Sequence, residues 1–409
     1  MQPQQARPPA SSLAGHWMLD PAVAMLNHGS FGACPRAVLQ RQRALRDQME
    51  QEPVRFFTRQ MQPLLDESRQ TLAGLVGVDP ADLVFVRNAT AGVNSVLRSL
   101  RLEPDDEILV TDHGYNACYN AVDFVARRAE AKVVTASLPL PIQSAGQVVE
   151  SIVACVTDRT RLAVLDHITS PTGVVFPIAE LVGELAKRRV DTLVDGAHGP
   201  GMVPLDLARI GAAYYAGNCH KWLCAPKGAA FLHVRPDRQP GVQPVVISHG
   251  FNTPRKGYNR FQDAFDFNGT DDPTPWLCVA EAIRFLDGLI DGGLEALMRR
   301  NRELALSGRR LLCGALGLVP CCSESMVGSL AALRLPDDAE FPPALDTQTT
   351  PTATHPLQTA LLEQWGIEVP VYHWPSAPQR LLRISSQAYN SEAQHEYLAA
   401  TLGRMLPKA

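Results

Sequence analysis

Residues 214–234 read YYAGNCHKWLCAPKGAAFLHV and place two lysines, Lys221 and Lys227, in an otherwise small and apolar segment. Burial in a medium of low dielectric constant disfavours the ammonium form of a lysine, and the neutral amine is a nucleophile toward carbonyl groups. The segment also reads as two short strands, 212–217 and 229–234, joined by a turn that carries both lysines. The surrounding sequence therefore has to show whether this turn belongs to a reactive site.

Short apolar segments alternate with longer amphipathic ones between residues 60 and 235, an order typical of α/β proteins. Helical patterns lie between several of the strands, for example at 91–100, 115–129 and 178–189. The predicted strands are 82–87, 107–112, 131–137, 161–167, 191–196, 212–217 and 229–234. The pattern predicts an α/β fold whose large domain holds a mostly parallel seven-stranded sheet, covered on both faces, with ligands at the carboxyl ends of its strands.

The pattern changes after residue 273. A long helical run is expected at roughly 274–316, followed by a Pro-rich stretch at 335–356, a helix near 356–366, a strand near 381–386 and a helix near 391–405. This predicts a smaller α+β domain, built from the C-terminal part together with the N-terminal segment. The expected division is an N-terminal arm (1–25), a large domain (26–290) and a small domain (291–409).

The composition excludes several classes of protein. The chain has 409 residues, 45% hydrophobic and 20% charged, with a net charge of −4 and no basic run, so we expect no nucleic-acid partner. The nine cysteines include no C-x-x-C pair, which favours reduced thiols over a disulfide framework or a metal site. Residues 1–12 lack the apolar core of a signal peptide, and no apolar run approaches the roughly 18 residues that cross a bilayer. We expect a soluble cytoplasmic protein with no membrane partner.

Asp195 ends the predicted strand 191–196, within the motif VDGAH. A buried carboxylate there needs a cation or several hydrogen-bond donors, and a helix cap or a structural ion pair is the plain alternative. Lys221 follows one strand and one turn later. The two side chains are therefore expected to face one cleft from neighbouring positions of the sheet.

Two further motifs follow predicted strands. Asn88, Ala89 and Thr90 open a helix whose first N–H groups lack partners, so they form either an anion site or a plain N-cap. His113 follows another strand, where a structural histidine is the alternative. Together with Asp195 and Lys221, these groups describe a ligand with a phosphate, a basic ring nitrogen and a carbonyl. That ligand is pyridoxal 5′-phosphate (PLP).

The chain resembles the class V aminotransferase superfamily of fold-type I PLP enzymes, and within it the isopenicillin N epimerase-like branch. The matching motifs run in order along nearly the whole chain. They are LNHGSFGACP (26–35), RNATAGVN (87–94), TDHGYNA (111–117), DHITSPTG (166–173), VDGAHGPG (194–201), GNCHKWLCAPKG (217–228), FNGTDDPTPWL (267–277) and LRISSQAYN (382–390).

The resemblance implies roles for the cofactor-binding residues. Lys221 matches the lysine that forms the Schiff base with PLP, and Asp195 matches the partner of the pyridine nitrogen. His198 is expected near the phenolic oxygen of the ring, with Thr169 as a second candidate, and His113 is expected to stack on the ring face. The residues expected around the phosphate are Asn88, Ala89, Thr90, Asn218 and His220.

The resemblance also implies an assembly and a substrate site. Gly269 and Thr270 match residues that reach the phosphate of the neighbouring subunit, so a homodimer with shared active sites is expected. Arg383 matches the arginine that binds a substrate α-carboxylate, assisted by Asn27. Lys227 matches a structural loop lysine. Two residues of the segment 365–383, Tyr372 and His373, are candidates for a second acid or base, with simple packing as the alternative.

The implied reaction is epimerisation at Cα, with Lys221 as the base. A C–S β-lyase, such as those of ergothioneine-type pathways, stays open because β-elimination needs the same residues. A cysteine desulfurase is disfavoured because residues 365–383 contain no cysteine to act as its nucleophile, and Cys321 and Cys322 lie well upstream. A non-enzymatic PLP-binding regulator is disfavoured because no helix-turn-helix fits before residue 26.

Overall fold

A computed structural model describes residues 8–337 and 354–406, and within these ranges the central sheet has seven strands in the order β2-β8-β7-β6-β5-β3-β4. Strand β8 runs antiparallel to β2 and β7, and the other neighbours are parallel. The strands are β2 (Leu83–Val86), β3 (Glu107–Thr111), β4 (Lys132–Ala136), β5 (Thr160–Asp166), β6 (Asp191–Gly196), β7 (Tyr214–Asn218) and β8 (Ala230–Val234). The predicted α/β fold with a mostly parallel seven-stranded sheet is confirmed.

Alternate side chains of each strand point to opposite faces of the sheet, as the two-residue period of a strand requires. In β2, Val84 and Val86 enter one apolar cluster, whereas Leu83 and Phe85 enter another. The first face is covered by α5 (Ala89–Ser99), α6 (Asn116–Ala129) and α10 (Arg260–Asp266). The second face is covered by α4 (Met61–Val76), α7 (Ala145–Val153), α8 (Ile178–Ala186) and α12 (Val279–Asp287). The sheet is thus buried between helices on both sides, and its strand ends are free to build a site.

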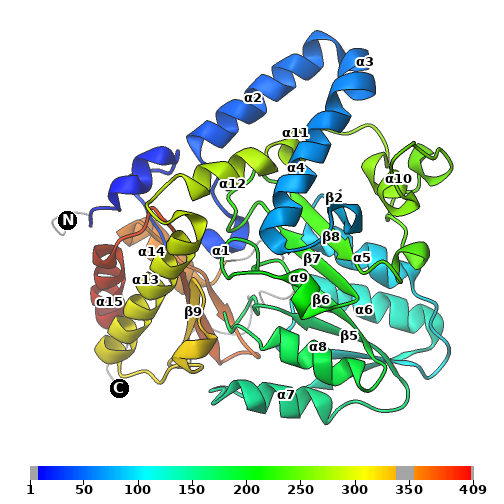
Figure 1. The fold of residues 1–409 in the computed structure, drawn as a ribbon. Helices are drawn as coiled ribbons and strands as arrows, with labels where there is room; N and C mark the ends of the chain where they lie inside the picture. The colour runs from blue at the N-terminus through cyan, green and yellow to red at the C-terminus, as the bar shows by residue number, and fades with distance from the viewer. Residues whose placement is uncertain (1–7, 338–353, 407–409) are drawn as a thin grey trace.

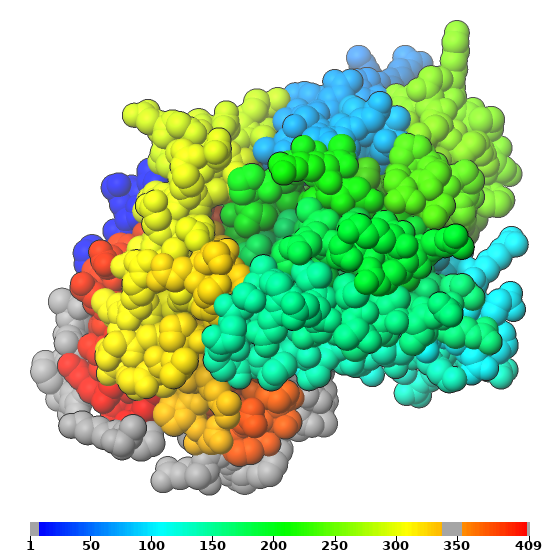
Figure 2. Space-filling model, turned by 60° about the horizontal axis from the view of Figure 1, so that its bottom comes forward, coloured from blue at the N-terminus to red at the C-terminus, as the bar shows by residue number. Residues whose placement is uncertain are grey.

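A second, antiparallel sheet lies in the C-terminal part, in the order β11-β12-β9, and packs with two helices. These elements are β9 (Leu330–Leu335), β11 (Val371–His373), β12 (Arg380–Ser385), α13 (Gly293–Leu316) and α15 (Glu392–Met405). In Figure 1 they form the yellow-to-red part of the molecule, and Figure 2 shows this part packed against the green and cyan part. The predicted smaller α+β unit is confirmed, whereas the exact domain boundaries stay a prediction.

The N-terminal segment joins the C-terminal part through a short parallel pair, β1 (Ala24–Met25) with β10 (Ile367–Glu368). The helices α2 and α4 project together at the top of Figure 1. The remaining helical segments are η1 (Ser12–His16), α1 (His28–Phe31), α2 (Arg36–Gln51), α3 (Pro53–Arg55), η2 (Phe56–Gln60), η3 (Pro80–Asp82), α9 (Leu207–Ile210), η4 (Gln239–Gly241), η5 (His249–Phe251), α11 (Thr274–Leu277), η6 (Glu324–Met326) and α14 (Pro356–Trp365).

The prediction of one helical run over 274–316 is wrong, because the structure divides it into α11, α12 and α13. Gly292 and Gly293 adopt φ values of 84° and 69° between α12 and α13, a left-handed conformation that interrupts a helix and that glycine adopts easily. Strand β9 was not predicted, since five of its six residues are buried and no alternation is visible. Residues 338–353 of the Pro-rich stretch, like residues 1–7, lie outside the described residues.

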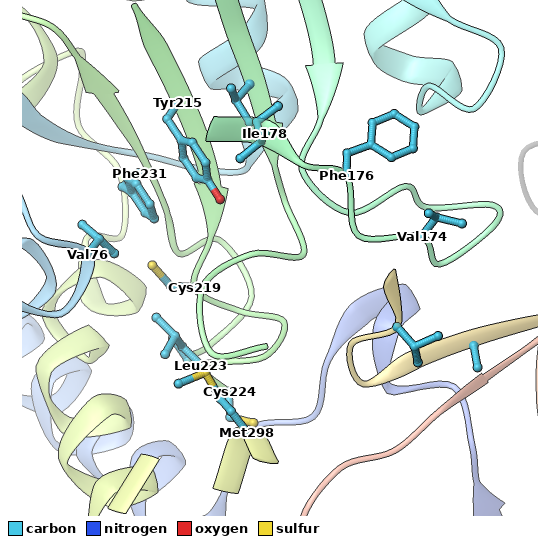
Figure 3. Close-up of a cluster of buried hydrophobic side chains, with 14 of the residues drawn as sticks. Val76, Val174, Phe176, Ile178, Tyr215, Cys219, Leu223, Cys224, Phe231 and Met298 are labelled. Atoms are coloured by element: carbon cyan, nitrogen blue, oxygen red, sulfur yellow. The ribbon is translucent and has the colours of Figure 1, made fainter. Parts of the chain in front are cut away.

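The loop between β7 and β8 carries Lys221 and is anchored from below by apolar side chains. Cys219, Leu223 and Cys224 belong to the cluster shown in Figure 3, on the side of Met298 from α13. Above them, the rings of Tyr215 and Phe231 from the two strands stack with centroids 6.1 Å apart. Because the loop residues on both sides of Lys221 are packed, the backbone of this lysine is held in place.

Candidate active site

Asp195 lies at the carboxyl end of β6, and its side chain is held by two donors. Oδ1 accepts a hydrogen bond from the Ala197 N–H at 3.0 Å, and Oδ2 accepts one from the Cys118 thiol of α6 at 2.9 Å. Burial, and then the charge of Asp195, raise the pKa of the Cys118 thiol, so the thiol stays protonated and donates. Asp195 thus presents a fixed oxygen pair at the wall of a cavity.

Lys221 is fixed at both its backbone and its side chain. His28 Nε2 donates to the Lys221 carbonyl at 2.9 Å, and the Lys221 amine lies 3.1 Å from His198 Nε2. Burial and then the nearby Arg383 guanidinium lower the pKa of Lys221 to about 8, against the opposing effect of Asp195. A much larger fraction of this amine than of an ordinary lysine is therefore neutral close to physiological pH, as a nucleophile or a base requires.

The N-terminal segment lies directly against the Lys221 loop at Gly32. A Cβ atom at Gly32, where φ is 71°, would lie 2.0 Å from the His220 carbonyl oxygen, so only glycine allows this approach. Lys227 is exposed, and its amine donates to the Gly32 carbonyl at 2.9 Å. The second lysine of the loop therefore ties the loop to the N-terminal segment instead of facing the cavity.

Helix α5 points its N-terminus at the same cavity. Asn88 caps the helix by accepting from the Ala91 N–H at 2.8 Å, and Asn218 of β7 accepts from the Ala89 N–H at 2.8 Å. Thr90 lines the cavity, and the N–H groups in the first turn of a helix have no partner within it. This end of the cavity is suited to an anion.

His220 lies beside this helix end, and its Nδ1 donates to the Ala229 carbonyl at 3.1 Å. Burial lowers the pKa of His220 to about 4, so the ring is neutral. Because Nδ1 faces the Ala229 carbonyl, Nε2 points away from it. The cavity has a volume of about 460 Å³, within the usual range of small-molecule sites. Its walls are formed by Ser30, Phe31, Arg87, Asn88, Ala89, Thr90, Tyr115, Asp166, Ser170, Asp195, Ala197, His198, Asn218, His220, Lys221 and Gly228.

Arg383 of β12 lies behind two of these wall residues and is only 4% exposed. One guanidinium nitrogen donates to the Ser170 carbonyl and, at 3.3 Å, to the Ser170 hydroxyl; the other donates to the Ser30 hydroxyl at 3.3 Å. Its Nε has no hydrogen-bond partner, and no carboxylate within residues 8–337 and 354–406 forms an ion pair with it. A buried cation in this state calls for an anion from outside the chain.

Asn27 is connected to this arginine through Ser30. The Asn27 amide accepts from the Ser30 hydroxyl at 2.5 Å and donates to Glu368 of β10 at 2.8 Å. Ser30 is thereby shared between Asn27 and Arg383. Asn27 is linked to Arg383 through Ser30, and both the oxygen and the nitrogen of its amide are engaged, so its role in assisting Arg383 stays a prediction.

Among the predicted site residues that do not line the cavity are His113, Thr169, Tyr372 and His373. His113 is fully buried, with Nδ1 at 2.7 Å from the Thr172 hydroxyl and Nε2 at 2.6 Å from the Leu138 carbonyl. Thr169 bonds to the same Thr172 hydroxyl at 2.7 Å and accepts from the Val174 N–H at 2.9 Å. The hydrogen bonds of both side chains are therefore made to the 169–174 turn and to the Leu138 carbonyl, and not into the cavity.

Tyr372 and His373 are the other two of these residues. The Tyr372 hydroxyl donates to the Pro171 carbonyl, next to the Ser170 that Arg383 contacts. The His373 ring lies edge-on to His355, with centroids 5.1 Å apart. Tyr372 thus supports the turn against which Arg383 rests, and His373 packs elsewhere.

Gly269 and Thr270 are exposed and line a neighbouring cavity of about 470 Å³. This second cavity shares Arg87, Asn88 and Thr90 with the first, so the two adjoin at the N-terminus of α5. Its wall also includes Val245 and Val246, which are 47% and 56% exposed. The predicted phosphate-contacting pair is therefore close to the anion end of the site.

Eight of the wall residues were not predicted, and three of them carry polar groups that bear on the chemistry of the site. Asp166 is the direct strand neighbour of Asp195, and burial together with Asp195 raises its pKa well above the ordinary value, which keeps this carboxyl protonated. Tyr115 and Ser170 also line the cavity. Asp166 opens the motif DHITSPTG at the end of the predicted strand 161–167, and this position could have marked it as a site residue. Tyr115 lies two residues beyond His113.

The described residues contain no group of three or more histidine, cysteine, aspartate or glutamate side chains placed to bind a metal ion. Over the same residues, no helix is long and apolar enough to cross a membrane.

The groups around the cavity fit PLP. Lys221 offers an amine for the aldehyde, Asp195 offers a carboxylate for the basic ring nitrogen, and the N-terminus of α5 offers Thr90 and the positive end of the helix for the phosphate. The fold and the site thus define a class of α/β protein that binds a phosphorylated carbonyl cofactor at the carboxyl ends of its strands.

Comparison with known proteins names this class. Residues 33–313 match the Aminotransferase class-V family, and the chain belongs to that family. It is 37% identical to isopenicillin N epimerase of Streptomyces clavuligerus over 95% of this chain and 96% of that protein. It is also 31% identical to putative L-cysteine desulfhydrase 1 of Oryza sativa subsp. japonica, over 94% of this chain and 83% of that protein.

A solved structure of the cystine C-S lyase C-DES, in complex with cysteine persulfide, shares the fold. It superposes with a TM-score of 0.78 at 22% sequence identity, covering 93% of this chain and 97% of that one. The resemblance to the isopenicillin N epimerase-like branch of class V is confirmed by the match over nearly the full chain.

Proposed function

We propose that this protein is a PLP-dependent enzyme that acts at Cα of an amino acid or an amino-acid-derived substrate, as an epimerase similar to isopenicillin N epimerase. One observation carries the proposal. A lysine whose pKa is lowered to about 8 shares a cavity with Asp195 and the N-terminus of α5, beside Arg383, a buried arginine with no acidic partner among the residues that the structure describes. The similarity to isopenicillin N epimerase supports the same reaction.

The cofactor is pyridoxal 5′-phosphate, which when bound supplies a protonated pyridine ring that accepts the electron pair released at Cα. Asp195 holds the proton on the ring nitrogen, and the Cys118 thiol and Ala197 N–H keep its carboxylate oriented. The α5 N-terminus, Asn218 and His220 surround the phosphate. Tyr115 lines the cavity and takes the position at the ring face that was expected for His113.

Arg383 binds the substrate carboxylate through its free Nε and the guanidinium nitrogen that Ser30 now shares. In this orientation the Cα–H bond would face Lys221, whose neutral amine would take the proton. Epimerisation then needs a proton delivered to the other face of Cα. The wall residues with a proton to give are Tyr115 and the protonated Asp166.

A C–S β-lyase is the second candidate function. The similarity to a putative L-cysteine desulfhydrase favours it, and elimination requires Lys221 but no second proton carrier. A desulfurase is less compatible, because none of the cavity's wall residues within the described parts of the chain is a cysteine. Cys321 is buried away from the cavity, and burial raises the pKa of its thiol to about 12, so it is a poor nucleophile.

Proton NMR in D₂O separates the two functions. The PLP-loaded protein is mixed with L- and D-amino acids and with S-substituted cysteines, and the Cα–H signals are followed. Loss of the Cα–H signal with an intact carbon skeleton supports epimerisation, whereas pyruvate with a released thiol supports the lyase. If the wild type gives neither product nor exchange with any substrate, the proposal fails.

We also propose a homodimer whose two sites are shared through Gly269 and Thr270. The exposed apolar residues Val245 and Val246 beside this pair support an interface there. Mixing an inactive Lys221→Ala chain with an inactive Thr270→Arg chain tests the arrangement, since a mixed dimer regains one intact site. A mixture that stays inactive, although it exchanges subunits, would contradict it. A cytoplasmic location stays a prediction.

A further inference from the structure

A chain of two hydrogen bonds leads from Trp222 through His198 to Lys221. The Trp222 indole Nε1 lies 3.1 Å from His198 Nδ1, and His198 Nε2 lies 3.1 Å from the Lys221 amine. Trp222 and His198 are each 1% exposed, so water does not compete for these groups. Ile168, Met202 and Leu330 pack around the indole ring and hold it in place.

The direction of these bonds follows from the chemistry of the donors. An indole nitrogen can only donate, so His198 Nδ1 has to accept and carries no proton. Burial first, and then Lys221 and Arg383, keep the pKa of His198 well below its ordinary value, so the ring is neutral. A neutral imidazole has one N–H group, and here that group has to be on Nε2.

We propose that Trp222 is a positioning residue that fixes His198 in the Nε2–H tautomer, so that His198 serves as a hydrogen-bond donor at the end of the Lys221 side chain. In the free chain the Lys221 amine accepts this bond through its lone pair, which requires the neutral amine. An ammonium group in the same place has no lone pair, so its N–H would face the imidazole N–H and neither group could accept.

The catalytic consequence rests on the proposed function. A His198 in this tautomer has no lone pair on the nitrogen that faces Lys221, so it is not the base that takes a proton from Cα. It instead donates to an acceptor atom of the bound cofactor or substrate. The proton carriers are then Lys221 and a group elsewhere on the cavity wall.

The test reads the tautomer itself. The full-length protein is labelled with ¹⁵N-histidine and its imidazole signals are recorded by long-range ¹H–¹⁵N NMR, with and without PLP. A His198→Gln variant identifies the signals of His198. The wild type is expected to show a protonated Nε2 and an unprotonated Nδ1, and a protonated Nδ1 would overturn the proposal whether or not the enzyme epimerises anything.

Two variants then test the part played by Trp222. Trp222→Phe keeps an aromatic ring but removes the donor, and it is expected to shift the ratio of the two His198 tautomers by about tenfold, the effect of losing one buried hydrogen bond. Trp17→Phe is the matched control, since Trp17 is also 1% exposed and its indole donates at 3.1 Å to the Ala33 carbonyl. If His198 keeps one tautomer in Trp222→Phe, Trp222 serves only in packing; if that variant does not fold, the wild-type spectrum decides.

Discussion

The cavity is bordered by two cations that the fold treats in opposite ways. At the β7 end, Lys221 is buried near Asp195, Asp166 and His198, and its pKa falls to about 8. At the β12 end, Arg383 is only 4% exposed, and its partners are the hydroxyl groups of two serines and the carbonyl group of one of them. An arginine keeps its charge in any protein environment, whereas a lysine gives up its proton when burial disfavours the ammonium form.

This difference indicates a division of work within one site. The Lys221 end is built for a group that changes its protonation state, because its neighbours include a carboxylate, a protonated carboxyl and a neutral imidazole. The Arg383 end is built for a fixed charge, because its hydrogen-bond partners are neutral and its Nε has no partner in the described part of the chain. The first suits proton transfer and covalent bonding, and the second suits recognition of a carboxylate.

The largest expected effect comes from removing the reactive amine. Lys221→Ala should lower turnover by roughly 10⁴-fold, since it removes the base and the group that binds the cofactor. Lys227→Ala, six residues further along the same loop, removes the amine that donates to the Gly32 carbonyl and should retain turnover. Steady-state kinetics on both variants, with dichroism spectra to check folding, makes the measurement. Comparable losses of turnover in both variants would show that the two lysines do not differ in their importance for catalysis.

The Arg383 end should respond through recognition. Arg383→Gln is expected to lower kcat/KM by roughly 10²-fold, the effect of losing a charge-assisted pair to the substrate carboxylate. Arg383→Lys should recover little of it, because an ammonium group cannot make the same forked contact. The discriminating measurement compares a substrate with its α-carboxamide, which wild type should reject and Arg383→Gln should not distinguish. Unchanged discrimination in Arg383→Gln would contradict a carboxylate-binding role.

The pKa of Lys221 also predicts how the stability of the cofactor-free chain depends on pH. Its folded-state pKa of about 8 lies below the ordinary lysine value of 10.5, so the unfolded chain binds more protons between these pH values and stability should rise with pH across that window. Lys221→Met should therefore stabilise the chain by about 2 kcal/mol below pH 8, and this gain should vanish toward pH 10.5. Urea unfolding at several pH values measures the difference. A gain that is constant with pH would show that burial of the charge is not its cause.

The smallest expected effect concerns the cysteine pair outside the cavity. Cys321→Ala and Cys322→Ala should each leave kcat within about twofold of wild type, since a nucleophile has to reach the substrate and these buried thiols do not. The assay is turnover with the best substrate found by NMR. Loss of activity in the folded Cys321→Ala variant would instead support a thiol-dependent reaction such as that of a desulfurase.

The sequence predicted most of the fold because its signals are local. Strands of the central sheet are short apolar runs bounded by turns, and each was expected within a few residues of its observed position. The break between α12 and α13 was missed because a helical pattern continues on both sides of Gly292 and Gly293. Strand β9 was missed because a strand buried on both faces shows no alternation.

The site was predicted in part for the same reason. Lys221, Asp195 and Thr90 each follow a strand or open a helix, and the parallel sheet brings such positions together. The orientation of individual side chains within a turn is not a local property of the sequence. Around Gly114, the turn that follows β3 directs His113 into the core and Tyr115 into the cavity. Pairing of Asp166 with Asp195 depends on strand register, which a single sequence does not give.

The central claim is that Lys221, and not Lys227, is the amine that reacts. Borohydride reduction of the PLP-loaded protein makes the bond between cofactor and lysine permanent, and peptide mapping by mass spectrometry then locates it. We expect the added phosphopyridoxyl mass on Lys221 alone, with no label at Lys227. Label on Lys227, or on another lysine while Lys221 stays unmodified, would show that Lys221 is not the reactive amine.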